Sequence, residues 1–247
     1  MSRMPRRFSE YGYMHLMFKG VNGQIIFEER SDYVYFLNLL KKTGIAQDVK
    51  ICAYCLMENH VHLLVYDKDQ RTPEFMRQLC RTYSLHFNQK YQRKGTLYQN
   101  RYTGKPIESE NYLLKVFHYI LNNPQKAGIC PAAEYPWSSY AKYGYPNSFV
   151  DTFVLKELIG SREAYDNFIA SDYTDAEDPT DLGANTKDDE WAKGIIHDHL
   201  HISSGTILQT YNTEARNEAL KLLKEKGLTI RQIERLTGIN RNIIQRV

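Results

Sequence analysis

The order of apolar patterns in the first half of the chain is the feature that most constrains the fold. Period-two alternation predicts extended segments over 50–57, 60–66 and 96–107, and a hairpin over 11–28 around a Gly20–Gly23 turn. Period-3.6 spacing predicts helices over 31–44, 72–94 and 109–124. The order β, α, β, β, α, β, α favours an α+β domain whose antiparallel sheet is covered by helices on one side.

The second half of the chain reads as helical, with one interruption. Two short helical patterns cover 152–159 and 161–169, and helical patterns resume at 190 and continue to 247. Between them, residues 171–189 are polar, acidic and aperiodic, which indicates a flexible linker. We therefore expect a first domain over 1–145, a helical extension of that domain over 146–170, the linker over 171–189 and a helical domain over 190–247.

Charge along the chain is segregated more strongly than the net charge of +3 suggests. Residues 71–107 hold 8 Lys and Arg against 1 acidic residue, 151–200 hold 4 against 13, and 213–247 hold 8 against 4. Two basic blocks separated by an acidic one favour a protein with two contact regions for a polyanion such as nucleic acid. The expected phosphate-binding side chains of the first block are Arg77, Arg81, Lys90, Arg93, Lys94, Arg101 and Lys105, with Tyr98 and Tyr102 as possible stacking rings.

The sequence offers no membrane or export signal. No apolar run approaches the roughly 18 residues that span a bilayer, and Met1–Ser9 lack the apolar segment of a signal peptide. Four cysteines in 247 residues fit reduced thiols better than a disulfide framework. We therefore expect a cytoplasmic protein that does not associate with membranes.

The most specific local motif is Asn59-His60-Val61-His62 with the apolar run that follows it. On a strand, His60 and His62 point to the same face, so two imidazoles could bind one divalent ion. Tyr119 and Asn123 are four residues apart on a predicted helix and share a face, so that helix could bring a phenol and an amide oxygen to the same place. Each motif alone also fits a structural role, in a strand or in the core.

Two other assignments of the ligand-like residues remain open. Cys52 and Cys55 together with His60 and His62 could form a zinc site, but residues three apart face opposite sides of a regular strand and would converge only at a bulge. A redox role for the Cys-x-x-Cys motif lacks a helix N-terminus that would lower the thiol pKa.

The C-terminal segment resembles a helix-turn-helix. A helix over 213–226 precedes a capping box formed by Thr229 and Gln232, and Gly238 marks a tight turn before a last helix. Arg241, Asn242 and Gln245 would lie on that last helix, and these are side-chain types that read base edges. A helical hairpin that does not bind DNA is the alternative.

The ordered set of motifs resembles the single-tyrosine HUH transposases, the insertion sequence 200 type, and within them the REP-associated tyrosine transposases. The motifs that carry the resemblance are Asn59–Leu64, Tyr98–Tyr102, Tyr119–Pro124 with Ala127-Gly128, and Tyr135–Tyr140. The resemblance covers about residues 11–143. Glu58 stands where that family commonly has Pro, and Gln125-Lys126 replace a more usual Val-Arg.

The resemblance implies a fold, a site and a reaction. It implies an HUH, ferredoxin-like domain over 1–145 in which His60, His62 and Asn123 hold Mg²⁺ or Mn²⁺ and Tyr119 is the nucleophile. It implies cleavage and rejoining of single-stranded or hairpin DNA, including REP-like palindromes, through a 5′-phosphotyrosine, by a monomer or a homodimer bound to the nucleoid. The alternative function is a non-catalytic DNA- or RNA-binding regulator on the same fold.

Overall fold

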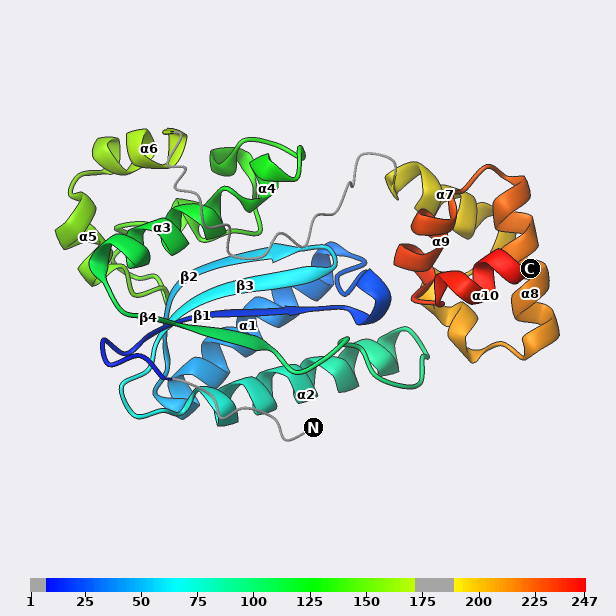
Figure 1. Cartoon of the computed structure of the whole chain (residues 1–247), viewed down its shortest axis with the longest axis horizontal. Coiled ribbons are helices and arrows are strands. Elements are labelled where there is room, and N and C mark those ends of the chain that lie inside the picture. Colours follow the sequence, from blue (N-terminus) through cyan, green and yellow to red (C-terminus); the bar gives the residue numbers. More distant parts are fainter. Residues whose placement is uncertain (1–7, 172–188) are drawn as a thin grey trace.

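The computed structural model describes residues 8–171 and 189–247, and the sheet at its centre has four antiparallel strands. The strands are β1 (Tyr13–Lys19), β2 (Lys50–Met57), β3 (His60–Tyr66) and β4 (Thr103–Ile107). They lie in the order β2-β3-β1-β4 (Figure 1). Two strands therefore have the bounds that alternation predicts, and the α+β fold class is confirmed.

The helices fall into two groups along the chain. Those of the first group are α1 (Arg30–Gln47), α2 (Thr72–Lys90), α3 (Glu110–Leu121), α4 (Asn123–Lys126), α5 (Phe153–Ile159) and α6 (Arg162–Ala170). Those of the second are α7 (Asp189–Leu200), α8 (Thr213–Glu225), α9 (Ile230–Thr237) and α10 (Arg241–Arg246). Short 3-10 turns lie at Val21–Gly23, Ala132–Glu134, Tyr140–Lys142 and Gly205–Thr210. None of the helices within the described residues is long and apolar enough to cross a bilayer.

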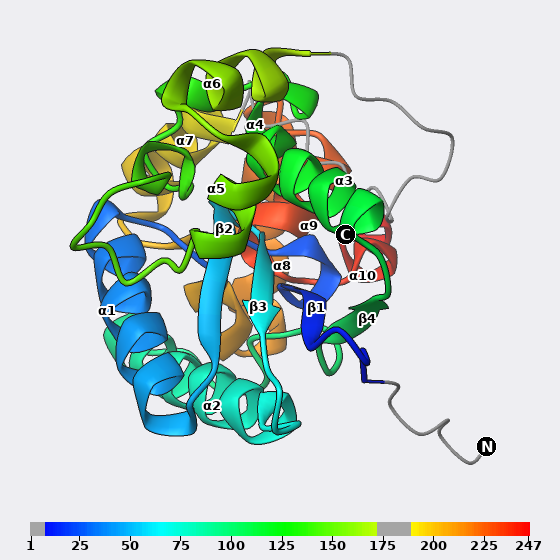
Figure 2. The ribbon, with the colours of Figure 1, turned by 90° about the vertical axis from the view of Figure 1, so that its left-hand side faces the viewer.

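Helices cover both faces of the sheet, not one face as the element order suggested (Figure 2). On one face, Leu16, Leu63 and other strand residues pack with α1 and α2. On the other face, Ala53, Cys55 and Leu64 pack against Val116, Phe117 and Ile120 of α3. His60 and His62 of β3 point to this second face, so α3 covers them.

Local capping explains where the helices start. The side chain of Ser109 accepts a hydrogen bond from the backbone N–H of Tyr112 at the start of α3, as expected of an N-cap serine. Pro73 stands in the first turn of α2, where its missing N–H costs nothing. The predicted capping box of Thr229 and Gln232 begins α9.

The expected second strand of the 11–28 hairpin does not form. The backbone N–H of Ile25 donates to the carbonyl of Arg235 in α9, and those of Ile26 and Phe27 donate to the carbonyl of Glu58. Because these donors are used by partners far along the chain, the segment cannot pair with β1 as a hairpin. The strand expected over 96–107 is likewise confined to β4, with one isolated bridge between Gly20 and Tyr98.

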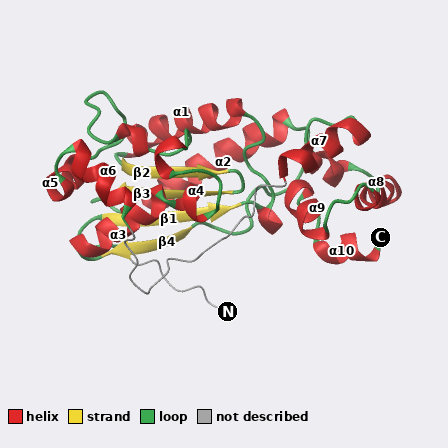
Figure 3. Ribbon diagram, turned by 90° about the horizontal axis from the view of Figure 1, so that it is seen from above, coloured by secondary structure: helices red, strands yellow, loops and turns green. Residues whose placement is uncertain are grey.

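The C-terminal helices form their own core and dock on one end of the sheet (Figures 1 and 3). That core includes Ile25 from the first domain, which is fully buried there. Polar contacts add to it: Gln209 donates to Gln24 at 3.0 Å, and the buried Arg93 donates to Gln209 at 2.9 Å. The helical domain expected over 190–247 therefore packs against the sheet domain. The linker assigned to 171–189 falls almost entirely outside the described residues.

Candidate active site beneath helix α3

His60 and His62 lie on the face of β3 that α3 covers, and both are buried, with 3% and 0% of their surface exposed. Strand pairing places His62 opposite Met17 of β1 and Cys55 of β2, and His60 opposite Lys19 and Met57. The prediction that the two imidazoles share a face is confirmed by this register. Neither imidazole is open to solvent, because α3 covers this face of the sheet.

His60 is oriented by two asparagines. Asn59 donates from its amide nitrogen to the carbonyl of Gly23 at 3.2 Å, so its Oδ1 faces His60 Nδ1 at 2.7 Å and accepts the Nδ1 proton. A neutral His60 then carries a lone pair on Nε2, which lies 3.3 Å from Oδ1 of Asn123. Two acceptor atoms facing each other at this distance suit a cation that both could bind.

His62 is oriented by a third histidine, His15 of β1. Nδ1 of His62 lies 3.1 Å from Nε2 of His15, and the rings stack with centroids 5.3 Å apart. Nε2 of His62 is buried and has no hydrogen-bond partner within the part of the chain that the structure describes. A buried polar atom without a partner costs about 1–3 kcal/mol, so its presence calls for a functional reason.

Burial and neighbouring charges keep His15 and His62 neutral at physiological pH. Burial, together with the charge of Lys105, lowers the pKa of His15 to about 4. Burial also lowers the pKa of His62 well below its usual range, with His60 and His15 contributing in the same direction. Neutral imidazoles are the form that binds metal ions.

Tyr119 of α3 lies against both histidine rings. Its ring centroid is 5.4 Å from that of His62 and 6.0 Å from that of His15, edge-on in both cases. Nζ of Lys126 lies 4.6 Å from the centroid of the Tyr119 ring. Asn123 follows the end of α3 and donates to the carbonyl of Tyr119 at 3.4 Å. The structure thus brings Tyr119 and Asn123 together with His60 and His62, a pair that lies some 60 residues earlier in the chain.

The donor set fits a divalent ion held by two imidazoles and an amide oxygen. Among the described residues, no three His, Cys, Asp or Glu side chains converge to hold an ion, so the site would depend on Asn123 and on oxygens of a substrate. Three protein ligands would leave coordination positions open for such oxygens, whereas a structural zinc site needs four protein ligands.

The two cysteines of the zinc alternative do not join the site. A β-bulge between Ile51 and Ala53 places Cys52 and Cys55 in the same core, against the prediction that they face opposite sides. Sγ of Cys55 contacts Sδ of Met57 at 3.6 Å, and Sγ of Cys52 contacts the carbonyl of Lys50 at 4.0 Å. Burial raises the pKa of both thiols, which disfavours the thiolate that binds zinc.

The basic residues expected to bind phosphate are divided between surface and interior. The exposed ones are Arg77, Arg81, Lys94 and Arg101, and all but Arg101 lie on or next to α2, on the far side of the sheet from the histidines. Lys90 instead pairs with the buried Asp32 at 2.6 Å, and Arg93 is buried against Gln209, so these two have structural partners. Arg77 pairs with Glu74. The sequence block therefore does not form one continuous surface.

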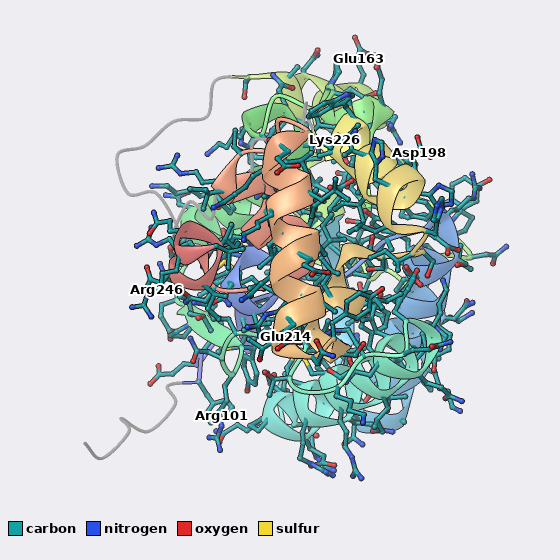
Figure 4. The ribbon with its side chains drawn as sticks, turned by 90° about the vertical axis from the view of Figure 1, so that its right-hand side faces the viewer. Arg101, Glu163, Asp198, Glu214, Lys226 and Arg246 are labelled. Atoms are coloured by element: carbon teal, nitrogen blue, oxygen red, sulfur yellow. The ribbon has the colours of Figure 1, made fainter. Side chains whose placement is uncertain are left out.

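Three groups of the expected DNA-contact residues lie in distinct places. Lys105 lies opposite His15 in the β1–β4 register. Tyr98 and Tyr102 line a cavity of about 490 Å³ beside α2, and Tyr98 packs edge-on against Phe18 with centroids 5.1 Å apart. Arg241, Asn242 and Gln245 are exposed on α10. Figure 4 shows Arg246 of the same helix and Arg101 extending toward the same side of the molecule.

Sequence reasoning missed His15 and Lys126. His15 stands in β1 at a position where alternation predicts only a polar face, and its contact with His62 depends on β1 lying beside β3. Lys126 ends α4, beyond the predicted end of the helix that holds Tyr119, so helical spacing gave no signal for it. Asn59 was noted only as part of the motif.

Comparison with known proteins gives matches to transposases. Residues 9–123 match a family model described as "Transposase IS200 like". A solved structure of a REP-associated tyrosine transposase bound to a REP hairpin is 16% identical, with 57% of this chain and 84% of that chain covered and a TM-score of 0.51. A putative transposase from Deinococcus radiodurans R1 is 19% identical, covering 49% of this chain and 97% of that one, with a TM-score of 0.34. The comparison with curated proteins found no match.

Proposed function

We propose, from the premise that residues 9–123 are a domain of the IS200-like transposase family, that this chain cleaves and rejoins DNA through a covalent bond to Tyr119. The match over residues 9–123 agrees with the resemblance stated from the sequence motifs and supports a transposase activity. The residues, the ion and the form of DNA are our proposal.

One observation carries the proposal. Side chains from β3 and α3, some 60 residues apart in the chain, converge in one buried place: Asn123 Oδ1 lies 3.3 Å from His60 Nε2, and the Tyr119 ring lies 5.4 Å from that of His62. A core needs no such group of neutral imidazoles beside an amide and a phenol, because an apolar cluster would pack there without unpartnered polar atoms.

His60, His62 and Asn123 would hold Mg²⁺ or Mn²⁺. A divalent ion at this position supplies Lewis acidity, which makes the phosphorus of a bound phosphodiester more electrophilic and offsets its negative charge. The partnerless Nε2 of His62 and the acceptor pair formed by His60 and Asn123 are the features of this chain that fit the ion.

Tyr119 would act as the nucleophile. Its phenol oxygen attacks the phosphorus and loses its proton, the bond from phosphorus to the 3′ oxygen breaks, and that oxygen leaves as a 3′-hydroxyl after taking up a proton. The new bond is a 5′-phosphotyrosine, which another 3′-hydroxyl reverses without ATP. The ammonium group of Lys126, 4.6 Å from the ring centroid, stabilises the negative charge that develops on the phenol.

The substrate would be single-stranded or hairpin DNA of the REP type. The similar solved structure was bound to a REP hairpin, and the charges of this chain suit such a ligand. Lys105 lies beside the histidines and could bind phosphates near the cleaved bond, while Arg241, Asn242 and Gln245 on α10 could contact the stem. Arg101 and Tyr102 lie on the segment that leads into β4, a few residues before Lys105.

Incubation with a pool of end-labelled hairpin oligonucleotides and Mn²⁺ tests the proposal. Denaturing gels should show a cleaved strand and a covalent protein–DNA adduct, and both should disappear in EDTA. DNA binding without cleavage or adduct, across all oligonucleotides that bind, would instead support the non-catalytic regulator.

A further inference from the structure

His15 and His62 are linked through one nitrogen of each ring. His15 lies on β1 and His62 on the neighbouring β3, and both are almost completely buried, with 3% and 0% exposed. Nε2 of His15 lies 3.1 Å from Nδ1 of His62, a hydrogen-bond distance. One of these nitrogens must donate and the other must accept.

The direction of this hydrogen bond decides what the other side of His62 can do. If His15 donates, a neutral His62 carries its proton on Nε2, and that atom cannot bind a cation. If His62 donates from Nδ1, its Nε2 keeps a lone pair. Only the second arrangement leaves His62 able to bind an ion through Nε2.

His60 shows the same arrangement with a different partner. Asn59 presents its carbonyl oxygen to Nδ1 of His60 at 2.7 Å, because its amide nitrogen is used by the carbonyl of Gly23. Metal-binding histidines commonly donate their second ring N–H to an outer acceptor, which fixes the tautomer and the ring orientation. Nε2 of His62 is buried without a partner in the described residues, which is the state expected of an atom whose ligand is a cation.

We infer that His15 is a positioning residue that accepts the Nδ1 proton of His62 and so holds His62 in the tautomer that binds the divalent ion. This inference rests on the proposed function, since it assigns the outer partner of one proposed ligand. An imidazole takes the place that a carboxylate, carbonyl or water usually has, so no negative charge is buried beside the site.

Two substitutions at His15 separate hydrogen bonding from packing. His15→Phe keeps a ring of similar size and removes the acceptor, whereas His15→Gln places an amide oxygen near the position of Nε2. We expect His15→Phe to weaken Mn²⁺ binding by about 10–100-fold, measured by the loss of the free Mn²⁺ EPR signal on titration. His15→Gln should recover most of that loss. His86→Phe is the matched control, because His86 is a half-buried histidine stacked on Tyr35 on the far side of the sheet.

The tautomer itself can be measured in the unsubstituted, metal-free protein. With ¹⁵N-labelled histidine, NMR should show His62 protonated at Nδ1, and His15→Phe should remove that preference. A His62 protonated at Nε2 in the unsubstituted protein would overturn the inference, even if every variant unfolds. Equal Mn²⁺ affinity of the unsubstituted protein and His15→Phe would overturn it too. Failure of the unsubstituted protein to bind Mn²⁺ would contradict the proposed function, while the tautomer measurement would still test His15.

Discussion

Nζ of Lys193 in α7 lies 3.0 Å from Oε1 of Glu58, the residue that opens the turn leading into His60 and His62. Glu58 is also the position where the resembling transposases commonly have Pro. The carbonyl of Glu58 accepts hydrogen bonds from Ile26 and Phe27, so this turn, the 24–29 segment and the C-terminal helices form one contact region. The departure at Glu58 therefore has a structural reason in this chain.

Removing the charge of Lys193 should loosen this contact. Both side chains of the pair are about one-fifth exposed, so Lys193→Met should lower the free energy of unfolding by about 1 kcal/mol, measured by urea denaturation. Lys221→Met, at an exposed position of α8, is the matched control and should change stability by less than about 0.5 kcal/mol. Equal effects of the two substitutions would show that the pair contributes nothing.

Glu28 should make stability depend on pH. Burial raises its pKa to about 7, with Asp32 and Glu58 adding to the shift and with Ser204 and Lys193 opposing it. Because the folded state holds this proton more tightly than the unfolded state, the contribution is full below about pH 4.5 and is lost as pH rises through about 7.

Glu28→Gln removes that dependence, since an amide resembles the protonated acid and still accepts from Ser204. The variant should match the unsubstituted protein near pH 5 and be more stable by about 1–3 kcal/mol at pH 8, measured by urea unfolding at both pH values. Glu134→Gln, at an exposed site, is the control, and its stability relative to the unsubstituted protein should be the same at both pH values. A Glu28→Gln difference that does not change with pH would contradict the assignment.

Lys126 should affect the rate of cleavage more than DNA binding. Lys126→Met keeps the aliphatic stem over the Tyr119 ring and removes the charge, so we expect kcat to fall by about 10–100-fold with an unchanged Tm. Single-turnover cleavage of a labelled hairpin measures it, with Lys42→Met on the exposed surface of α1 as control. Loss of binding with an unchanged single-turnover rate would assign Lys126 to substrate binding alone.

The two histidines of the motif should respond differently to truncation. His60→Ala and His62→Ala should both abolish metal-dependent cleavage, but His62 is fully buried and bonded to His15, so its loss should also cost about 2 kcal/mol of stability in EDTA. His86→Ala should retain cleavage. Mg²⁺-dependent cleavage at full rate by the double variant would remove both residues from the site.

Local sequence patterns predicted the helices and strands well, but they predicted poorly which elements pair or pack with one another. The bounds of β2 and β3, the Ser109 cap of α3 and the capping box of α9 depend on neighbouring residues, and the structure has all of them. The hairpin over 11–28 was wrong because Ile25 is used by the core of the C-terminal helices, some 200 residues away in the chain.

The site was predictable only in part for the same reason. Spacing of two on a strand and of four on a helix made His60, His62, Tyr119 and Asn123 candidates, and the family resemblance supplied their expected roles. His15 could not be found, because its role depends on which strand lies beside β3. Helix α3 covers the histidines because the second face of the sheet is also apolar. The mixture of polar and apolar residues in β3 did not indicate that second apolar face.

The identity of the nucleophile is the central claim, and Tyr119→Phe tests it most directly. The substitution removes one oxygen and keeps the ring against His62 and Lys126, so Tm should change little. Mass spectrometry of the unsubstituted protein after reaction with a hairpin oligonucleotide should place the nucleotide on Tyr119, and Tyr119→Phe should form no adduct and cleave no DNA. An adduct on another tyrosine, such as Tyr112 or Tyr102, or undiminished cleavage by Tyr119→Phe, would contradict the account.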